Sequence, residues 1–154
     1  MKRNDSPKTE ALALIMPVEG RIYDLEYSPD DTFRRGTAGP GFVIDPADHV
    51  LYAPFTGTIE LIYPTRHVIV IRSLSGVDVM IHIGFDREHL RGEAIELMVE
   101  PGQTVSTGDP LASFDRELLA LSYAQKAILV IFLQKKGIEL RTEDETNYRV
   151  TIRT

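Results

Sequence analysis

The chain contains no cysteine, which removes several classes of chemistry from consideration. A protein without cysteine cannot form disulfide bonds, bind a metal through thiolates or use a cysteine nucleophile. Long hydrophobic runs are missing too: the most apolar stretch, Ala127 to Leu133, is much too short to span a bilayer. The first ten residues are polar and lack the apolar segment of a secretion signal. These absences predict a cytoplasmic protein that does not insert into the membrane.

Basic residues are in the minority. The 154 residues include 17 Lys and Arg against 23 Asp and Glu, which gives a formal net charge of −6. Proteins that bind nucleic acid normally carry a clustered excess of Lys and Arg. The composition therefore predicts no nucleic-acid partner and no attraction to an anionic membrane surface, while it leaves docking to a basic protein patch open.

Helical periodicity is scarce as well. Short apolar runs alternate with Gly and Pro about every 8 to 12 residues, a spacing typical of a sandwich or barrel of strands. The best helix candidate is short, from Arg116 to Gln125, with Asp115 placed to cap its start. We therefore expect an all-β fold, an antiparallel β-sandwich or barrel with one or two short helices. It should form one domain over residues 11–154, after a flexible polar tail of residues 1–10.

Two turn segments resemble each other. Met16 to Ile22 reads MPVEGRI and Ala53 to Ile59 reads APFTGTI, each with Pro and Gly three residues apart before an apolar strand. Chance similarity between turn sequences and a structural repeat in a small barrel both explain this pattern. A third segment, residues 99–111, is typical of biotinyl- and lipoyl-type barrel-sandwich proteins, and by itself it indicates an architecture without an activity.

Two histidines lie on neighbouring predicted strands, His67 to Arg72 and Val77 to Gly84. These strands are close enough in sequence to form an antiparallel hairpin. A two-residue loop of Leu74-Ser75 would place His67 directly opposite His82, and a loop of Ser75-Gly76 would make them diagonal neighbours on one face. A three-residue loop would put them on opposite faces, because a one-residue shift inverts every side chain.

Paired imidazoles suit transfer of a charged group. An imidazole is nucleophilic only when it is neutral, and apolar neighbours such as those of His82 lower the pKa of a histidine by penalising the cation. A phosphoryl group bound there would need hydrogen-bond donors, which His67, Thr65 and the backbone near Gly84 can supply. A structural role for both histidines in the core is the competing interpretation.

Several motifs in order resemble the glucose-type IIA family of the sugar phosphotransferase system. The segment Gly76 to Asp86, GVDVMIHIGFD, is similar to the phosphohistidine signature of that family, and Thr65-x-His67 is similar to its second-histidine segment. Upstream, Ser28 to Phe33 and Gly39 to Pro46 are similar to its Pro-Asp-x-x-Phe and Gly-x-Gly segments. The resemblance covers roughly residues 11–152.

The resemblance implies a role for each of these residues. His82 would accept the phosphoryl group, His67 would assist it and Thr65 would orient His67. The group would come from the phosphohistidine protein HPr and pass to a IIB domain, which can be part of a IIBC transporter. The resemblance also implies a monomer without cofactor or metal. The residues that it places on or around the partner-docking surface are Asp30, Phe33, Tyr63, Ile83, Gly84 and Asp86.

Three other functions compete with this one. A regulator could use the same histidine surface to bind proteins without transferring a group, and a desolvation penalty would then make docking depend on phosphorylation. A zinc hydrolase would need a third protein ligand, and His49 and His89 have no matched strand partner. A lipoate or biotin carrier needs an exposed lysine at a hairpin tip, and no lysine occurs between Lys8 and Lys126.

Overall fold

A computed structural model describes residues 9–85 and 94–153 of the chain. Every strand pair in it is antiparallel, which confirms the expected all-β class. The strands are β1 (Thr9–Ile15), β2 (Gly20–Asp24), β3 (Gly41–Pro46), β4 (Val50–Tyr52), β5 (Gly57–Ile62), β6 (Val68–Ser73), β7 (Asp78–Ile83), β8 (Ile95–Leu97), β9 (Thr104–Val105), β10 (Pro110–Phe114), β11 (Ile128–Phe132), β12 (Gly137–Thr142) and β13 (Asn147–Arg153). The helical segments are η1 (Leu25–Tyr27), α1 (Asp31–Arg34), η3 (Arg116–Ala120) and α2 (Tyr123–Lys126), where η marks a 3₁₀-helix.

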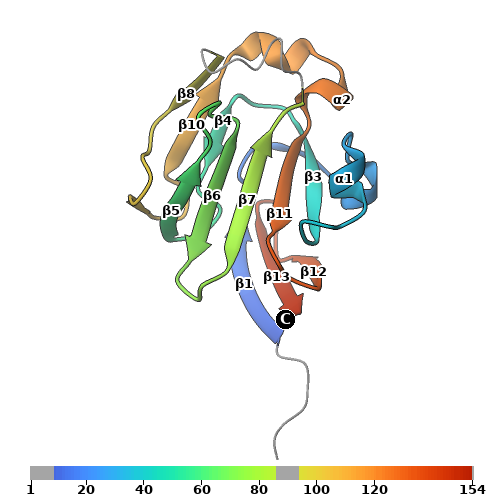
Figure 1. Ribbon diagram of the computed structural model, residues 1–154, viewed down its shortest axis with the longest axis vertical. Coiled ribbons are helices and arrows are strands. Elements are labelled where there is room, and N and C mark those ends of the chain that lie inside the picture. The colour runs from blue at the N-terminus through green and yellow to red at the C-terminus, as the bar shows by residue number, and fades with distance from the viewer. Residues whose placement is uncertain (1–8, 86–93, 154) are drawn as a thin grey trace, which may run out of the picture.

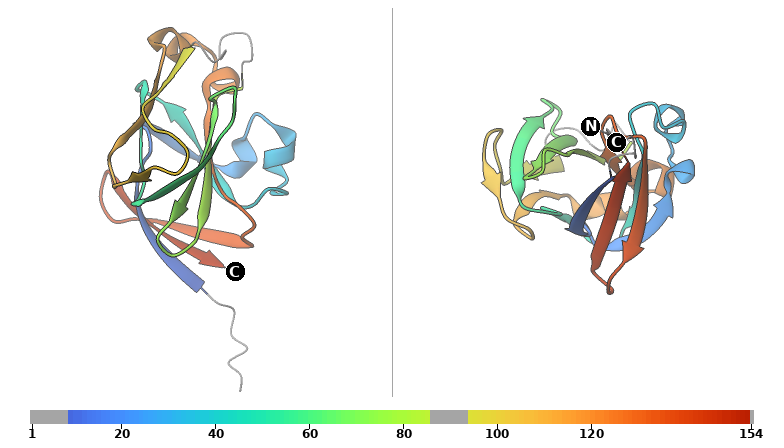
Figure 2. Two further views of the ribbon diagram at one scale, coloured as in Figure 1. Left: turned by 60° about the vertical axis from the view of Figure 1, so that its left-hand side comes forward. Right: turned by 90° about the horizontal axis from the view of Figure 1, so that it is seen from below.

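The strands form three sheets around one core (Figure 1). The largest has the order β2-β3-β11-β7-β6-β5-β9, and the sheet β4-β10-β8 packs against its inner face. The third sheet, β1-β13-β12, lies at the end of the molecule that carries the C-terminus (Figure 2). In the part of the chain that the structure describes, no helix is long and apolar enough to cross a membrane.

The apolar stretch near residue 130 is strand β11, and all five of its residues are buried. Ile128, Val130 and Phe132 point into the core between the sheets. Leu129 and Ile131 point to the opposite face, into a second apolar cluster that we call the outer cluster. A strand that is buried on both faces has a continuous hydrophobic sequence. Burial inside the protein therefore accounts for the apolar residues of β11. The outer cluster consists of Val43, Val68, Val70, Met80, Ala127, Leu129 and Ile131.

The two similar turns occupy equivalent positions, so the similarity reflects a structural repeat. Gly20 begins β2 and Gly57 begins β5, and each strand pairs antiparallel with the strand that follows it in the chain, β3 or β6. A Cβ added at Gly20 would lie 2.2 Å from the backbone oxygen of Asp45, and one added at Gly57 would lie 2.1 Å from that of Arg72. The β2–β3 and β5–β6 pairs therefore each require a residue without a side chain where the first strand begins, at Gly20 and at Gly57.

Replacing Gly57 by alanine should lower the free energy of unfolding by on the order of 3 kcal/mol, because the backbone oxygen in its path cannot rotate away. Gly137→Ala is the matched control, since its Cβ would meet only Arg153 Cδ at 3.9 Å. That control should change the free energy of unfolding by less than about 0.5 kcal/mol. Urea denaturation measures both values, and equal effects of the two substitutions would contradict the proposed close approach.

Two boundaries differ from the sequence-based expectation. The predicted helix from Arg116 to Gln125 is divided into η3 and α2, because Ser122 and Gln125 form a capping box that starts a new helix. Asp115 caps the first of the two through the backbone N–H of Glu117, as expected. The N-terminal tail was predicted to extend to residue 10, but β1 begins at Thr9 because its backbone pairs with Arg153 of β13.

Candidate functional site

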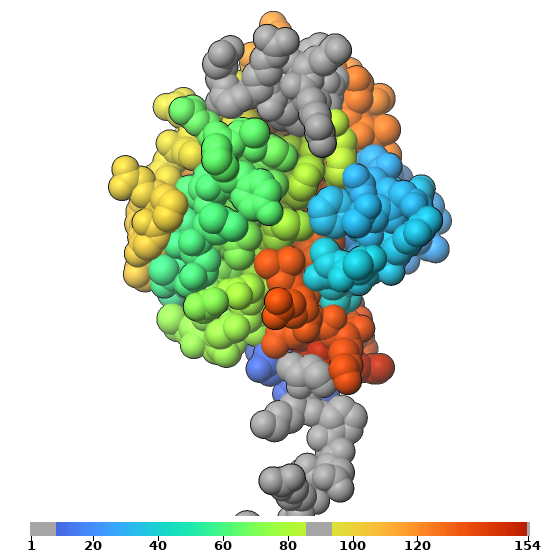
Figure 3. All heavy atoms as spheres, in the orientation of Figure 1, coloured from blue at the N-terminus to red at the C-terminus, as the bar shows by residue number. Residues whose placement is uncertain are grey.

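His82 lies near the end of β7, on the face of the large sheet that carries the outer cluster. Its neighbours on the adjacent strands are Val68 and Leu129, both buried. The ring of Phe33, from α1, meets the imidazole edge-on with the centroids 5.4 Å apart. Figure 3 shows the end of β7 between the green surface preceding β6 and the blue surface of α1. Apolar groups therefore surround this histidine on an accessible face of the sheet.

The imidazole rings of His67 and His82 meet, but by a route that differs from the hairpin prediction. The backbone N–H of Ser73 bonds to the oxygen of Val77 beyond the end of β6, so three residues, 74–76, close the hairpin, and Val68 is the residue opposite His82. A regular strand would then direct His67 to the core with Ile69. Instead, β6 begins only at Val68, and Arg66 before it has a positive φ of 66°. That turn brings the rings within 5.0 Å between centroids, at an interplanar angle of 84°.

Thr65 has the position that its predicted role requires. Its hydroxyl lies 2.5 Å from Nδ1 of His67, within the turn that precedes β6. A hydrogen bond at one ring nitrogen holds the plane of an imidazole and selects its tautomer. When the hydroxyl donates, the proton of the neutral His67 ring is on Nε2, so that this nitrogen can donate a hydrogen bond.

The surroundings of His82 favour its neutral form. Burial lowers the pKa of His82 from 6.5 to about 4, and the neighbouring His67 acts in the same direction. The negative charge of Asp30 and the backbone of Gly84 and of His82 itself act in the opposite direction. Nδ1 of His82 is buried and makes no hydrogen bond of ordinary geometry to a described residue. The ring is thus a neutral base at physiological pH.

This lowered pKa predicts a pH dependence of stability. Between the ordinary value of 6.5 and the folded value of about 4, the unfolded chain takes up a proton at residue 82 that the folded chain does not. The free energy of unfolding should therefore fall as the pH falls through this window, by at most about 3 kcal/mol. NMR titration of the ring gives the folded pKa directly, and His82→Gln should remove this part of the pH dependence. A folded pKa near 6.5 would contradict the prediction.

Three of the predicted docking residues surround the histidine pair. Asp30 caps α1 by accepting a hydrogen bond of 2.8 Å from the backbone N–H of Thr32, and it thereby sets the position of Phe33. Tyr63 is 44% exposed, and its ring lies 6.4 Å from that of His67 between centroids. Asp30, Phe33 and Tyr63 are therefore within reach of a partner that approaches His82.

Of the other three predicted docking residues, two are buried and one lies outside the described residues. Ile83 is only 2% exposed and packs in the core, because successive residues of a strand point to opposite faces. Its side chain therefore cannot contact a partner. Gly84 is buried and contributes only backbone, and Asp86 lies outside the described residues.

Phe85 belongs to the site although no role was predicted for it. Its ring stacks on the imidazole of His82, with centroids 4.8 Å apart and an interplanar angle of 21°. Gly84 has a positive φ of 68°, a conformation that ends the strand and allows the chain to turn back there. The signal in the sequence that could have indicated this role is an aromatic residue directly after a glycine at the end of a strand.

His49 and the possible metal ligands among the described residues do not add to the site. His49 pairs with Asp48, its Nδ1 lying 2.9 Å from the carboxylate, and His89 is outside the described residues. Among residues 9–85 and 94–153, no group of three or more His, Asp or Glu side chains is arranged to hold a metal ion. The described part of the chain thus offers no metal site for the zinc hydrolase alternative.

Comparison with known proteins identifies the family of the chain. The family model for the phosphoenolpyruvate-dependent sugar phosphotransferase system, EIIA 1, matches residues 12–138. The glucose-specific EIIA component of Halalkalibacterium halodurans is 35% identical over 117 residues, which cover 76% of this chain and 68% of that protein. The corresponding component of Bacillus cereus is 36% identical over 112 residues, or 73% and 68% of the two chains.

Larger proteins and a solved structure are also similar. The mannose-specific EIIBCA component of Corynebacterium glutamicum is 36% identical over 110 residues, which cover 71% of this chain but only 16% of that protein. The glucose permease IIA of Mycoplasma capricolum superimposes with a TM-score of 0.76 and 28% identity, covering 91% of this chain and 96% of that one. The chain therefore belongs to the EIIA 1 family of the phosphoenolpyruvate-dependent sugar phosphotransferase system and is a phosphocarrier of that system.

Proposed function

We propose that the chain carries the phosphoryl group on Nε2 of His82. The observation that supports this most directly is a neutral imidazole on an apolar face, with the ring of a second histidine 5.0 Å away. Because Nδ1 of His82 is buried, Nε2 is the nitrogen left to attack phosphorus. Its lone pair forms the new N–P bond while the N–P bond of a donor phosphohistidine breaks, and the donor imidazole keeps that bonding pair.

His67 and Thr65 stabilise the phosphoryl group in this proposal. With Thr65 bound to Nδ1, His67 directs Nε2–H to a phosphoryl oxygen, where a charge-assisted hydrogen bond is stronger than a neutral one. Such a donor contributes most as the group moves, since phosphoryl transfer depends mainly on positioning and charge stabilisation. Phe33 and Phe85 keep water away from the ring, which keeps it neutral and slows hydrolysis of the phosphohistidine.

The partners follow from the family. EIIA components work with the IIB and IIC components of their system, and the Corynebacterium relative is itself an EIIBCA component. We infer that phosphorylated HPr is the donor, that a IIB domain is the acceptor and that a IIC component then takes up the sugar. We also propose a cytoplasmic monomer of glucose type with one domain that includes β1 from Thr9 onward. The names of relatives include glucose, mannose and lactose, and the partner would select the sugar.

The test is phosphorylation in a defined mixture. The chain is incubated with phosphoenolpyruvate, Enzyme I and HPr, and intact mass is measured before and after mild acid. We expect one phosphoryl group per chain, stable to base and released by acid, and dependent on each added component. Failure of the folded wild-type chain to gain this group would refute the proposal.

A purely regulatory role is not favoured, because the family and its named relatives are transport components. A His82→Asp variant separates the two roles. If the chain only regulated partners by docking, this substitution would change binding while sugar uptake continued, whereas a phosphocarrier would lose uptake.

A further inference from the structure

Lys126 is a charged residue placed largely inside the protein, at the end of α2. Its side chain is only 17% exposed, and its amine lies 3.3 Å from Oδ1 of Asp45 on β3. It also donates a hydrogen bond of 3.1 Å to the backbone oxygen of Leu119 in η3. Oδ1 of Asp45 is buried and makes no hydrogen bond to a described residue, so the contact with Lys126 is an ion pair without ideal hydrogen-bond alignment. One amine thus links α2 to β3 and to η3.

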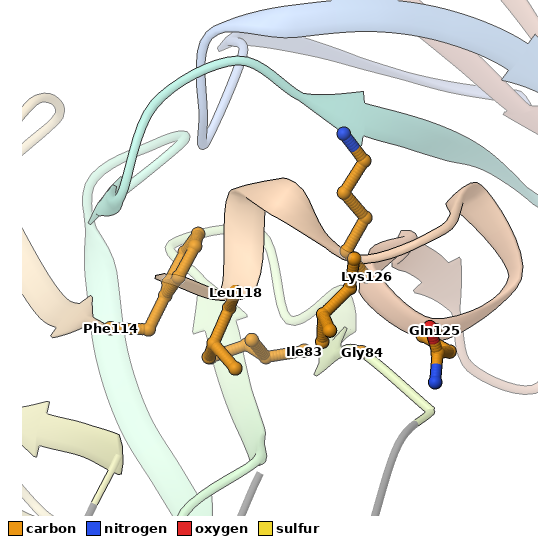
Figure 4. Close-up of a pocket in the computed structure, with 7 residues that line it drawn as sticks. Ile83, Gly84, Phe114, Leu118, Gln125 and Lys126 are labelled. Atoms are coloured by element: carbon orange, nitrogen blue, oxygen red, sulfur yellow. The ribbon is translucent and has the colours of Figure 1, made fainter. Parts of the chain in front are cut away.

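The residues on either side of Lys126 hold the chain that leaves His82. The backbone oxygen of Ala127 accepts a 3.0 Å hydrogen bond from the N–H of Gly84, and that of Gln125 accepts one of 2.8 Å from the N–H of Phe85. Figure 4 shows Gln125 and Lys126 beside Ile83 and Gly84, with the Lys126 side chain extending away from them. Any movement of the backbone at residues 125–127 would therefore move Phe85, whose ring covers His82.

Other contacts also hold this segment: Ala127 is buried in the outer cluster, and its N–H donates a 3.0 Å hydrogen bond to the backbone oxygen of Tyr123. The helix α2 has four residues, too few for a helix to be stable without external support. Among the further contacts of α2 are the capping box between Ser122 and Gln125 and a 2.7 Å hydrogen bond from the Tyr123 hydroxyl to the backbone oxygen of Tyr27. Both of these act on the N-terminal side of Lys126. The ion pair is made by the residue that lies between the two backbone oxygens that receive Gly84 and Phe85.

We infer that Lys126 is a positioning residue for phosphotransfer: its ion pair with Asp45 holds residues 125–127 in place, and these hold Phe85 against His82. This inference rests on the proposed role of His82 as the phosphoryl acceptor. Lys126 itself does not touch the imidazole. It acts through the backbone of its neighbours, and its effect should therefore appear at His82 as a change in solvation.

The test is Lys126→Met, which keeps the length of the side chain and removes its charge. The loosened Phe85 ring should admit water to His82, so NMR titration should show the pKa of His82 rising from about 4 toward 6.5. The rate of phosphorylation by phosphorylated HPr should fall about tenfold, because a small misplacement at a reacting centre has an effect of this order or larger. In Lys126→Arg, the pKa of His82 and the rate of phosphorylation should both stay at their wild-type values, since this variant keeps the charge that faces Asp45.

Lys135→Met is the matched control. Lys135 is 19% exposed and forms a 3.7 Å ion pair with Glu10, in the region where the third sheet packs. This variant should leave both the titration of His82 and the rate unchanged. Should Lys126→Met not fold, Asp45→Asn removes the charge of the other partner with little change in shape, and the pKa of His82 should move in the same direction.

An unchanged titration of His82 in a folded variant would overturn the inference, as would an equal shift in the Lys135 control. The titration needs no phosphoryl donor, so it can be interpreted even if the wild-type chain is not phosphorylated. A pKa shift without any wild-type phosphorylation would support the positioning contact and refute the proposed function.

Discussion

Replacing His82 by glutamine is expected to abolish phosphorylation of the chain completely. Glutamine fills a space similar to that of the imidazole but offers no basic nitrogen to attack phosphorus. His67 should not substitute for it, because the Thr65 hydroxyl occupies one of its nitrogens and the ring lies outside the regular strand. Intact mass after incubation with phosphoenolpyruvate, Enzyme I and HPr measures the result.

His49→Gln is the control for this substitution. His49 is bound to Asp48 at a site that does not include the histidine pair, so its loss should leave one phosphoryl group per chain. Thermal unfolding of both variants verifies that they are folded at the assay temperature. A full gain of phosphate by folded His82→Gln would assign the acceptor to another residue.

Replacing His67 by alanine should have the next largest effect, and it should affect the two half-reactions differently. His82 keeps its nucleophilic nitrogen, so the chain should still become phosphorylated. Transfer from the phosphorylated chain to a IIB domain should slow by about 10² to 10³-fold, the usual loss when one hydrogen-bond donor to developing charge is removed. Rapid quench with labelled phosphate measures each half-reaction separately.

Thr65→Val gives a graded comparison for His67. It keeps the imidazole and removes the hydroxyl that lies 2.5 Å from its Nδ1. Onward transfer should be slowed less than by His67→Ala, because the ring can still reach the phosphoryl group but loses its preferred orientation. Onward transfer at the wild-type rate in His67→Ala would show that the second histidine does not assist.

Several features of the site could be predicted from the sequence because they depend on local chemistry. The residue types around His82 predicted a neutral imidazole, and its lowered pKa agrees with that expectation. The Pro and Gly pairs of the two similar turns indicated either a repeat or chance similarity, and the close backbone approach at both Gly20 and Gly57 favours the repeat. Asp115 was recognised as a helix cap because capping requires only a few neighbouring residues.

The contact between the rings of His67 and His82 could not be predicted from the strand register. Counting residues across the hairpin predicts the face of a side chain only inside a regular strand. The loop proved to have the length that was expected to separate the rings, and the positive φ of Arg66 brought them together nevertheless. Phe85 was missed for a similar reason, since it reaches His82 only after the turn at Gly84.

The all-β class and the resemblance to the family could be read from the residues alone, and the same residues led us to propose His82, His67 and Thr65 as the site. Other features could not be foreseen and follow from the packing of the sheets: the rings that touch His82, the core-facing side chain of Ile83 and the ion pair of Lys126 with Asp45. The physical reason is the range of the interactions. Propensity, capping and strand alternation act over a few residues, whereas a ring stack or an ion pair joins segments that become neighbours only when the sheets pack.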